Sequence, residues 1–240
     1  MTSIHRGYFG CRMTAVAAAV MLPAALALAG CSSVVSGTAV AANSQAGSLH
    51  HVAASLSSLL PAPGAFPAPY TAVVLPPPAA AEAAHDLVGI AAGATVTPPS
   101  CQPPAQDYSA DGTAIIVGTD NSTRSTITIE LARVTEPLSQ RRDQLRECTK
   151  VTVRKNGNTA TLRSELTPPP PIDADDTLAV RQTLTSGKAV KPLKQSMLSL
   201  VAQVGDVRIT ATFMTFGSNR PDTATLDQIF TDVVGKVRRS

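Results

Sequence analysis

Apolar and polar residues alternate along much of the second half of the chain, with the two-residue period of β-strands. Segment 124–134 has apolar side chains at 127, 129 and 131 and polar ones at 126, 128 and 130, which predicts a half-buried antiparallel strand. Further strands are predicted at 113–118, on both flanks of Asn156-Gly157, at 177–184, and on both flanks of Gly205-Asp206. The two dipeptides favour tight hairpin turns.

Three other segments have helical spacing of their apolar residues: 79–92, 137–148 and the stretch after Asp222, which is a suitable N-cap. In the middle helix the apolar side chains Leu138 and Leu145 are predicted to face inward together with Cys148. The predicted fold class is α+β, an antiparallel sheet of about five to seven strands with two or three helices packed on one face.

An uncharged, alanine-rich stretch precedes this domain. It follows Arg6 and Arg12, runs from Met13 to Gly30 and is interrupted by Pro23. A membrane-spanning helix needs about 20 strongly apolar residues. A signal peptide over residues 1–30 explains the stretch better.

The signal peptide ends in Leu28-Ala29-Gly30-Cys31, which resembles the lipobox of bacterial lipoproteins. The resemblance implies cleavage before Cys31, acylation of its sulfur and anchoring by several acyl chains, which together are stable. The expected localisation is the extracytoplasmic face of the cell membrane, with the membrane as a partner through the lipid anchor. An ordinary secreted protein and an uncleaved N-terminal anchor are the alternatives.

Composition divides the rest of the chain. Residues 31–55 are rich in Ser, Ala, Gly, Thr and Val without periodicity, which predicts a lipidated cysteine followed by a flexible tether. His50 and His51 lie in this tether, and two ligands there do not make a complete metal site. Residues 56–240 are expected to form one domain, entered through a proline-rich, extended segment along its edge.

The charge balance argues against one class of partner. Without Arg6 and Arg12 the chain has 18 basic and 17 acidic residues, which does not favour nucleic-acid binding. Of the four cysteines, Cys11 leaves with the signal peptide and Cys31 carries the lipid, so Cys101 and Cys148 remain. Outside the cytoplasm a disulfide between them is the expectation. Two free thiols in redox chemistry are the alternative.

Catalytic spacing is missing: the sequence contains no G-x-S-x-G, S-x-x-K or H-E-x-x-H and no glycine-rich phosphate loop. We therefore expect no enzyme, no cofactor and no metal site. Arg142, Arg146 and Lys150 follow one another at intervals of four along the predicted helix and its end. This stripe is the candidate contact for an anionic ligand, although a solvated surface explains it too.

The order of elements resembles one family. A proline-rich entry, Cys101 after Pro98-Pro99, a helix ending at Cys148, the stretch VGDVRITAT and a terminal helix containing LDQIF are similar to uncharacterised mycobacterial lipoproteins. Their domain resembles the extracellular sensor domain of PknH-type receptor serine/threonine kinases. The resemblance spans roughly residues 56–238 and implies a ligand-binding cleft and a disulfide-stabilised core. The chain departs from it in having one cysteine pair where two are expected, and no kinase half.

The leading functional hypothesis is a lipid-anchored, non-enzymatic and sensor-like lipoprotein of the cell envelope. Its partner is an unknown small ligand or envelope component. A carrier of lipid or glycolipid is the alternative, which requires an enclosed apolar cavity. An envelope hydrolase is the third hypothesis, which requires two carboxylates converging in a cleft.

Overall fold

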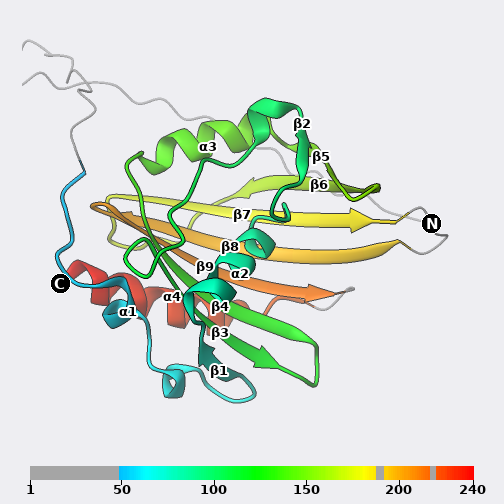
Figure 1. The fold of residues 1–240 in the computed structure, drawn as a ribbon. Helices are drawn as coiled ribbons and strands as arrows, with labels where there is room; N and C mark the ends of the chain where they lie inside the picture. The colour runs from blue at the N-terminus through cyan, green and yellow to red at the C-terminus, as the bar shows by residue number, and fades with distance from the viewer. Residues whose placement is uncertain (1–48, 188–191, 217–219) are drawn as a thin grey trace, which may run out of the picture. The chain divides into compact units, whose positions relative to one another are not determined.

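Nine strands form one antiparallel sheet in the order β1-β3-β4-β9-β8-β7-β6-β5-β2 (Figure 1). The computed structural model describes residues 49–187, 192–216 and 220–240, so Cys31, the signal peptide and most of the tether lie outside the described residues. The strands are β1 (Thr71–Val74), β2 (Thr95–Thr97), β3 (Thr113–Asp120), β4 (Ser125–Arg133), β5 (Lys150–Lys155), β6 (Asn158–Thr167), β7 (Asp176–Ser186), β8 (Leu193–Val204) and β9 (Val207–Phe216). The α-helices are α1 (Leu56–Leu59), α2 (Pro77–Leu87), α3 (Leu138–Glu147) and α4 (Thr223–Arg238); Pro63–Ala65 and Pro99–Cys101 form short 3-10 helices.

The α+β class is confirmed, but the predicted number of elements is too low. The described ranges contain nine strands and four α-helices, against five to seven strands and two or three helices. The two missed strands, β1 and β2, are the short edges of the sheet and are flanked by prolines. A strand of three or four residues next to proline has too little alternation to be seen in the sequence.

Local chemistry explains where the predicted elements begin and end. Asn156 and Gly157 have φ angles of 49° and 76°, the left-handed pair that a tight β5–β6 turn requires. Asp222 caps α4, since its Oδ1 accepts a hydrogen bond of 3.2 Å from the Thr225 amide. α2 begins at Pro77, two residues before the predicted helix over 79–92, because proline fits the first helical turn.

One face of the sheet, here called the closed face, carries the main apolar core. α4 packs on β8 and β9 and α1 packs on β3 and β4. Buried residues of the strands, among them Ile129, Leu200 and Ile209, meet Leu226, Phe230 and other apolar residues of α4 there. Ile209, Leu226 and Phe230 have no exposed surface. The closed face is therefore packed by apolar side chains alone over its centre.

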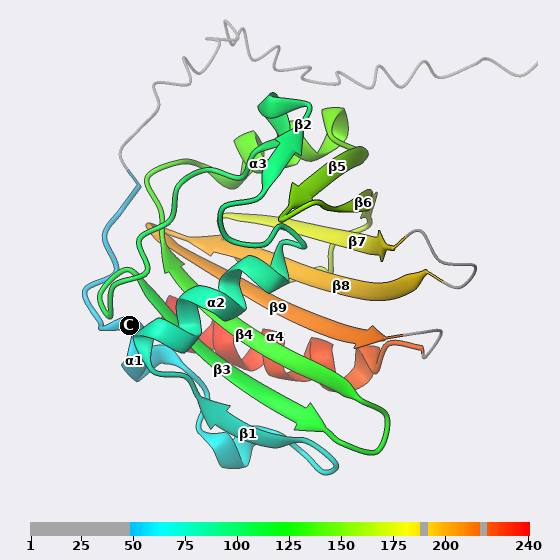
Figure 2. The same cartoon turned by 45° about the vertical axis from the view of Figure 1, so that its right-hand side comes forward.

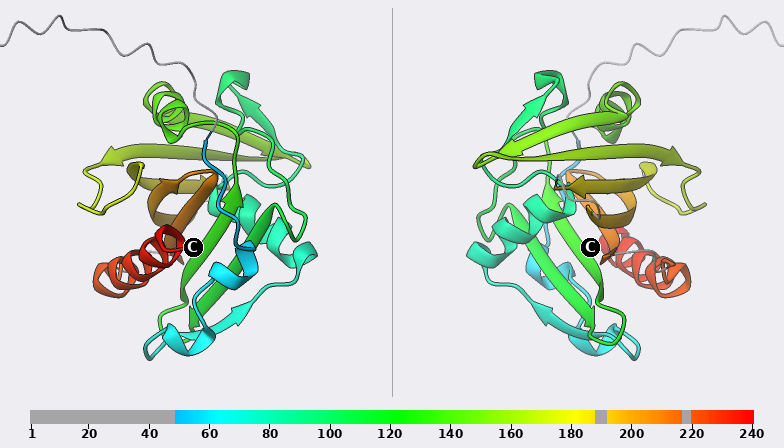
Figure 3. Two further views of the ribbon diagram at one scale, coloured as in Figure 1. Left: turned by 90° about the vertical axis from the view of Figure 1, so that its left-hand side faces the viewer. Right: turned by 90° about the vertical axis from the view of Figure 1, so that its right-hand side faces the viewer.

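The opposite face, here called the cleft face, is covered by α2 beside β3 and by α3 beside β6 and β7. Figure 2 shows α2 in front of the sheet and α4 behind it, and Figure 3 shows the two helices on opposite sides of the sheet seen on edge. The prediction that helices cover only one face is wrong. Thr128 and Glu130, predicted on a solvated face of β4, are only 3% and 7% exposed because the cover extends over them.

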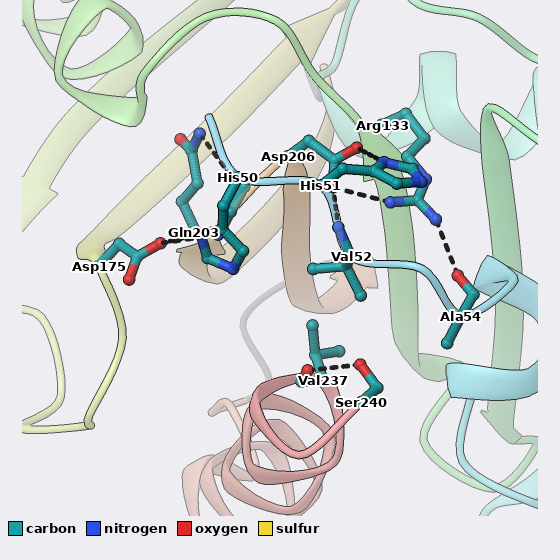
Figure 4. A network of polar contacts seen from close by, with 11 residues as sticks. His50, His51, Val52, Ala54, Arg133, Asp175, Gln203, Asp206, Val237 and Ser240 are labelled. Atoms are coloured by element: carbon teal, nitrogen blue, oxygen red, sulfur yellow. Dashed lines mark hydrogen bonds and ion pairs between the residues drawn. The ribbon is translucent and has the colours of Figure 1, made fainter. Parts of the chain in front are cut away.

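The end of the predicted tether belongs to the domain. Segment 50–54 runs beside the turn between β8 and β9 (Figure 4). The Asp206 amide donates to the His50 carbonyl oxygen (2.9 Å), and the Asp206 carboxylate accepts from the Val52 amide (2.9 Å) and lies 2.7 Å from His51 Nδ1. Arg133 donates to Asp206 (2.7 Å) and to the Ala54 carbonyl oxygen (2.8 Å). A flexible tether through residue 55 is therefore corrected: the chain is held from His50 onward.

This attachment also explains a glycine. Gly205 has φ +54°, and a Cβ there would lie 2.3 Å from the His50 carbonyl oxygen. Burial by itself would raise the pKa of Asp206, but the hydrogen bonds from Val52, His51 and Arg133 and the arginine charge outweigh it and lower the pKa. The carboxylate is thus ionised where it holds the entry segment.

Candidate functional site

A hollow lies on the cleft face between the sheet, α2, α3 and the loop 102–106. Its floor is a row of register partners across four neighbouring strands: Glu130 pairs with Thr210, Thr210 with Val201 and Val201 with Leu178. Because side chains alternate along a strand, these residues face the hollow while their neighbours form the core of the closed face. The sheet thus brings a carboxylate, a hydroxyl and two apolar side chains to one surface.

The walls are mostly apolar. Leu87 and Val88 come from the end of α2, Pro103, Pro104 and Gln106 from the loop, and Leu138, Arg141 and Leu145 from α3. This inner hollow has a volume of about 110 Å³. An outer hollow of about 210 Å³ shares Pro104, Arg141 and Arg208 with it and is otherwise lined by Gln102, Glu136, Pro137, Gln140 and Gln144. We refer to the two hollows together as the cleft.

The predicted disulfide holds one wall of the cleft. Cys101 and Cys148 are bonded, which joins the start of the wall loop to the end of α3. Beside the bond, Gln144 Nε2 donates to the carbonyl oxygens of Ser100 (3.0 Å) and Gln102 (2.9 Å). The loop has no strand partner of its own here, so a covalent bond and one amide fix its distance from α3.

Glu130 is buried at the bottom of the inner hollow. Burial raises its pKa, while a hydrogen bond from Gln106 and the charge of Arg208 oppose the rise. Gln106 Nε2 donates both to Glu130 Oε1 (2.7 Å) and to Thr113 Oγ1 (3.0 Å), so its two hydrogens are used. Glu130 therefore keeps its proton to a higher pH than an exposed glutamate does.

Two arginines lie where the inner and outer hollows meet. Burial and the neighbouring charge of Arg208 lower the pKa of Arg141 to about 10. Arg141 donates to Gln144 Oε1, a neutral acceptor. Arg208 donates through Nη2 to the Glu136 carbonyl oxygen (3.0 Å), and its Nε is buried without a hydrogen-bond partner among the described residues. Two guanidinium groups thus line a cleft whose inner hollow contains a single carboxylate.

The predicted basic stripe lies elsewhere. Arg142 is engaged by the Asp176 carboxylate and by the Thr177 carbonyl oxygen (2.9 Å), and Arg146 pairs with Asp143 at 2.8 Å. α3 ends at Glu147, so Lys150 is on β5 and not on the helix. The stripe is therefore not one helical face and does not line the cleft, and its contact with anions stays a prediction. The functional candidate that the stripe missed is Arg141, beside Arg142.

Two other sequence expectations concern metals and membranes. In the ranges that the structure describes, no group of three or more His, Cys, Asp or Glu side chains is arranged to hold a metal ion. Asp175, in the loop before β7, accepts a hydrogen bond from the Gly205 amide at 2.7 Å. No described helix is both long and apolar enough to cross a membrane. Acylation of Cys31 stays a prediction.

Comparison with known proteins places this geometry in a family. A family model described as a domain of unknown function (DUF5642) matches residues 62–238. The fold is similar to the extracellular domain of PknH from Mycobacterium tuberculosis, with 18% identity, a TM-score of 0.41, and coverage of 61% of this chain and 78% of that chain. It is also similar to a putative uncharacterized protein, the Rv0999 ortholog from Mycobacterium smegmatis, with 14% identity, a TM-score of 0.39, and coverage of 70% and 86%. The resemblance stated from the sequence is found in these two structures. None of the curated proteins compared with the chain matches it significantly.

Proposed function

The chain belongs to the DUF5642 family, and we propose that it is a lipid-anchored, extracytoplasmic and non-enzymatic lipoprotein that binds a small ligand in the cleft. One observation carries the proposal. The cleft face of the sheet holds Glu130 and Arg208 in buried or half-buried positions, where polar groups cost stability. Their neighbours in the same strands, which face the other side of the sheet, are apolar core residues.

The two other hypotheses have less support in the cleft. A lipid carrier needs a large enclosed apolar cavity, and the inner hollow of about 110 Å³ is below even the roughly 150 Å³ apolar cavity that accommodates benzene. A hydrolase of the type predicted needs two converging carboxylates, whereas Glu130 lines the inner hollow and Glu136 lines the outer hollow. Binding without catalysis requires neither.

Filling the cleft tests the binding function. Thr210→Phe puts a ring into the inner hollow, whereas Thr185→Phe makes the same change on β7 away from it. Both variants and the wild type are purified in detergent from their own membrane and weighed by native mass spectrometry. We expect a non-covalently held molecule on the wild type and on T185F that is absent from T210F, with all three melting cooperatively. Equal retention by T210F, or an empty wild type, overturns the proposal.

The lipid anchor has a separate test. Cys31→Ala is expected to remove the acyl mass and to shift the protein from the membrane fraction to the soluble fraction, because two or more chains are needed for stable anchoring. Cys11→Ala is the matched control, since Cys11 lies in the predicted signal peptide and should leave both properties unchanged. Unchanged mass and fractionation of C31A would refute acylation at this site.

A further inference from the structure

The two cleft arginines differ from the other well-placed arginines of the domain. Arg133, Arg142, Arg146 and Arg238 each form an ion pair with an aspartate. Among the ion pairs of the described ranges, none includes Arg141 or Arg208. Both residues nevertheless line both hollows, and the charge of Arg208 disfavours that of Arg141. Bringing like charges together without a paired anion destabilises the folded state. A bound anion would remove this cost.

The carboxylates nearby act on only one of the two arginines. Glu130 and Glu136 both act on Arg208 electrostatically, but no carboxylate contributes to the environment of Arg141. Glu130 gives its Oε1 to Gln106, and its burial favours the protonated form. Glu136 contacts Arg208 through its backbone carbonyl oxygen. The junction of the hollows therefore carries two guanidinium groups, and Arg141 is the one on which no carboxylate acts.

The hydrogen-bond geometry points in the same direction. Arg208 Nε is buried without an acceptor in the described part of the chain, and only Nη2 has a partner there. A guanidinium group offers five donors in a planar fork that matches carboxylate and phosphate oxygens. An anion at the junction of the hollows would supply the acceptors that both arginines lack.

The rest of the inner hollow selects for an apolar partner. Leu138 and Leu145 of α3 pack with Leu178, Val180 and Val201 of the sheet in one buried apolar cluster, which lines the hollow. Its volume of about 110 Å³ is of the order of the roughly 150 Å³ apolar cavity that accommodates benzene. A molecule that fills it has a short apolar part and a charged end toward Arg141 and Arg208.

We propose that the ligand is a small organic anion, with its carboxylate or phosphate group held by Arg141 and Arg208 and its short apolar part in the inner hollow. This inference rests on the proposed binding function and specifies its ligand class. It replaces the stripe of Arg142, Arg146 and Lys150 as the anion contact. The two arginines come from α3 and β9, far apart in sequence, so the site exists only in the folded domain.

The test uses the full-length protein in lipid nanodiscs and isothermal titration calorimetry, with empty nanodiscs as the blank. The probes are hexanoate, hexyl phosphate, hexanol, hexylammonium and inorganic phosphate. We expect one of the two hexyl anions to bind at least about tenfold more tightly than hexanol, hexylammonium and inorganic phosphate, because only it satisfies both the arginines and the apolar wall. The better of hexanoate and hexyl phosphate identifies the acid group.

Three matched variants assign the charge recognition. Arg141→Gln and Arg208→Gln are each expected to weaken binding of the better anion roughly 10- to 100-fold, the effect of losing a charge-assisted hydrogen bond. Arg146→Gln, on the exposed side of the same helix, should leave it unchanged. R141Q should also melt no lower than the wild type, since it removes a like charge; a purely structural arginine would lower the melting temperature. R141Q decides the question if R208Q fails to fold.

The outcomes separate the two proposals. If hexanol or hexylammonium binds tightly and T210F abolishes that binding, the proposed anionic ligand is refuted. The proposed binding function then still holds. The same holds if R141Q, R208Q and R146Q all bind equally. If inorganic phosphate binds as tightly as hexyl phosphate, the proposal that the ligand has an apolar part in the inner hollow is refuted. A protein that binds no probe and retains no molecule from its membrane refutes both proposals.

Discussion

The closed face and the cleft face are built from the same strands, but the closed face is apolar over its centre and the cleft face mixes apolar with polar and charged residues. On β8, Leu198, Leu200 and Ala202 enter the core of the closed face, while Ser199 and Val201 line the cleft between them. On β9, Val207, Ile209 and Ala211 alternate with Arg208 and Thr210 in the same way. The two faces share one backbone. Their difference in composition therefore reflects the segments that cover each face and the side chains that each face buries.

The difference shows where stability and function are separated. The closed face is covered by a continuous amphipathic helix, α4, whose buried residues keep helical spacing. The cleft face is covered by two helices and a loop that do not close over its centre, and polar groups occupy the remaining space. Some are satisfied by each other, as Ser199 and Thr212 are at 2.9 Å. Glu130, Arg141 and Arg208 are not fully compensated.

Removing the disulfide should have the largest effect, and it acts on the cleft side of the comparison. Cys101→Ser with Cys148→Ser opens a loop with a sequence separation of 47, which costs about 4 kcal/mol in the chain-entropy model. Urea denaturation of the double variant measures it, and the wild type in reducing buffer is the control that should give the same loss. A double variant as stable as the oxidised wild type would show that the hydrogen bonds of Gln144 and Gln106 hold the loop without the disulfide.

Truncating neighbouring residues of β8 compares the two faces directly. Leu200→Ala on the closed face should cost about 3 kcal/mol, since it leaves a cavity in a packed core. Ser199→Ala, one residue earlier on the cleft face, should cost only about 1 kcal/mol, the loss of its hydrogen bond with Thr212. Urea denaturation of each variant gives both values. Equal losses would contradict the view that the closed face carries the stability.

Sequence reasoning recovered the closed face well and the cleft face poorly. The alternation in β4 and the spacing in α4 predicted which residues are buried, because burial against one layer leaves a periodic signal. The same period placed Thr128 and Glu130 in solvent, since a polar residue in a strand reads as exposed whether or not another segment covers it. The cover comes from α2 and the loop 102–106, which are close to β4 only in three dimensions.

The candidate site was missed for a related reason. Arg142 and Arg146 stood out by their spacing, yet spacing along a helix shows which residues share a face and not what that face meets. Arg141, on another side of α3, turns toward the cleft. Arg208 gave no such signal, since it lies between Val207 and Ile209 at a position that the alternation of β9 assigns to a solvated face. The cysteine pair was predicted correctly because only two cysteines remained to pair.

The smallest predicted effect concerns the titration of Glu130, a buried carboxyl group of the cleft face. The apolar centre of the closed face contains no such group. Because burial raises its pKa, the folded chain holds the Glu130 proton more tightly than the unfolded chain, whose glutamate titrates near 4.5. Between these two pKa values the folded state binds more protons. Its free energy of unfolding therefore falls as the pH rises through that interval, by at most about 1.4 kcal/mol per pH unit. Below pH 4.5 the contribution is fully present.

Glu130→Gln removes the proton and keeps the Oε1 acceptor for Gln106. The free energy of unfolding of the variant should therefore rise relative to that of the wild type as the pH is raised from 4.5. Urea denaturation at intervals of half a pH unit measures this difference. Glu165→Gln, at an exposed position of β6, should follow the wild type at every pH. If E130Q also runs parallel to the wild type, Arg208 compensates the Glu130 charge in full, and Arg141 would be the one cleft arginine left for an anion. A widening gap instead means that the cleft face keeps a carboxyl group at a cost to folding that the closed face never incurs.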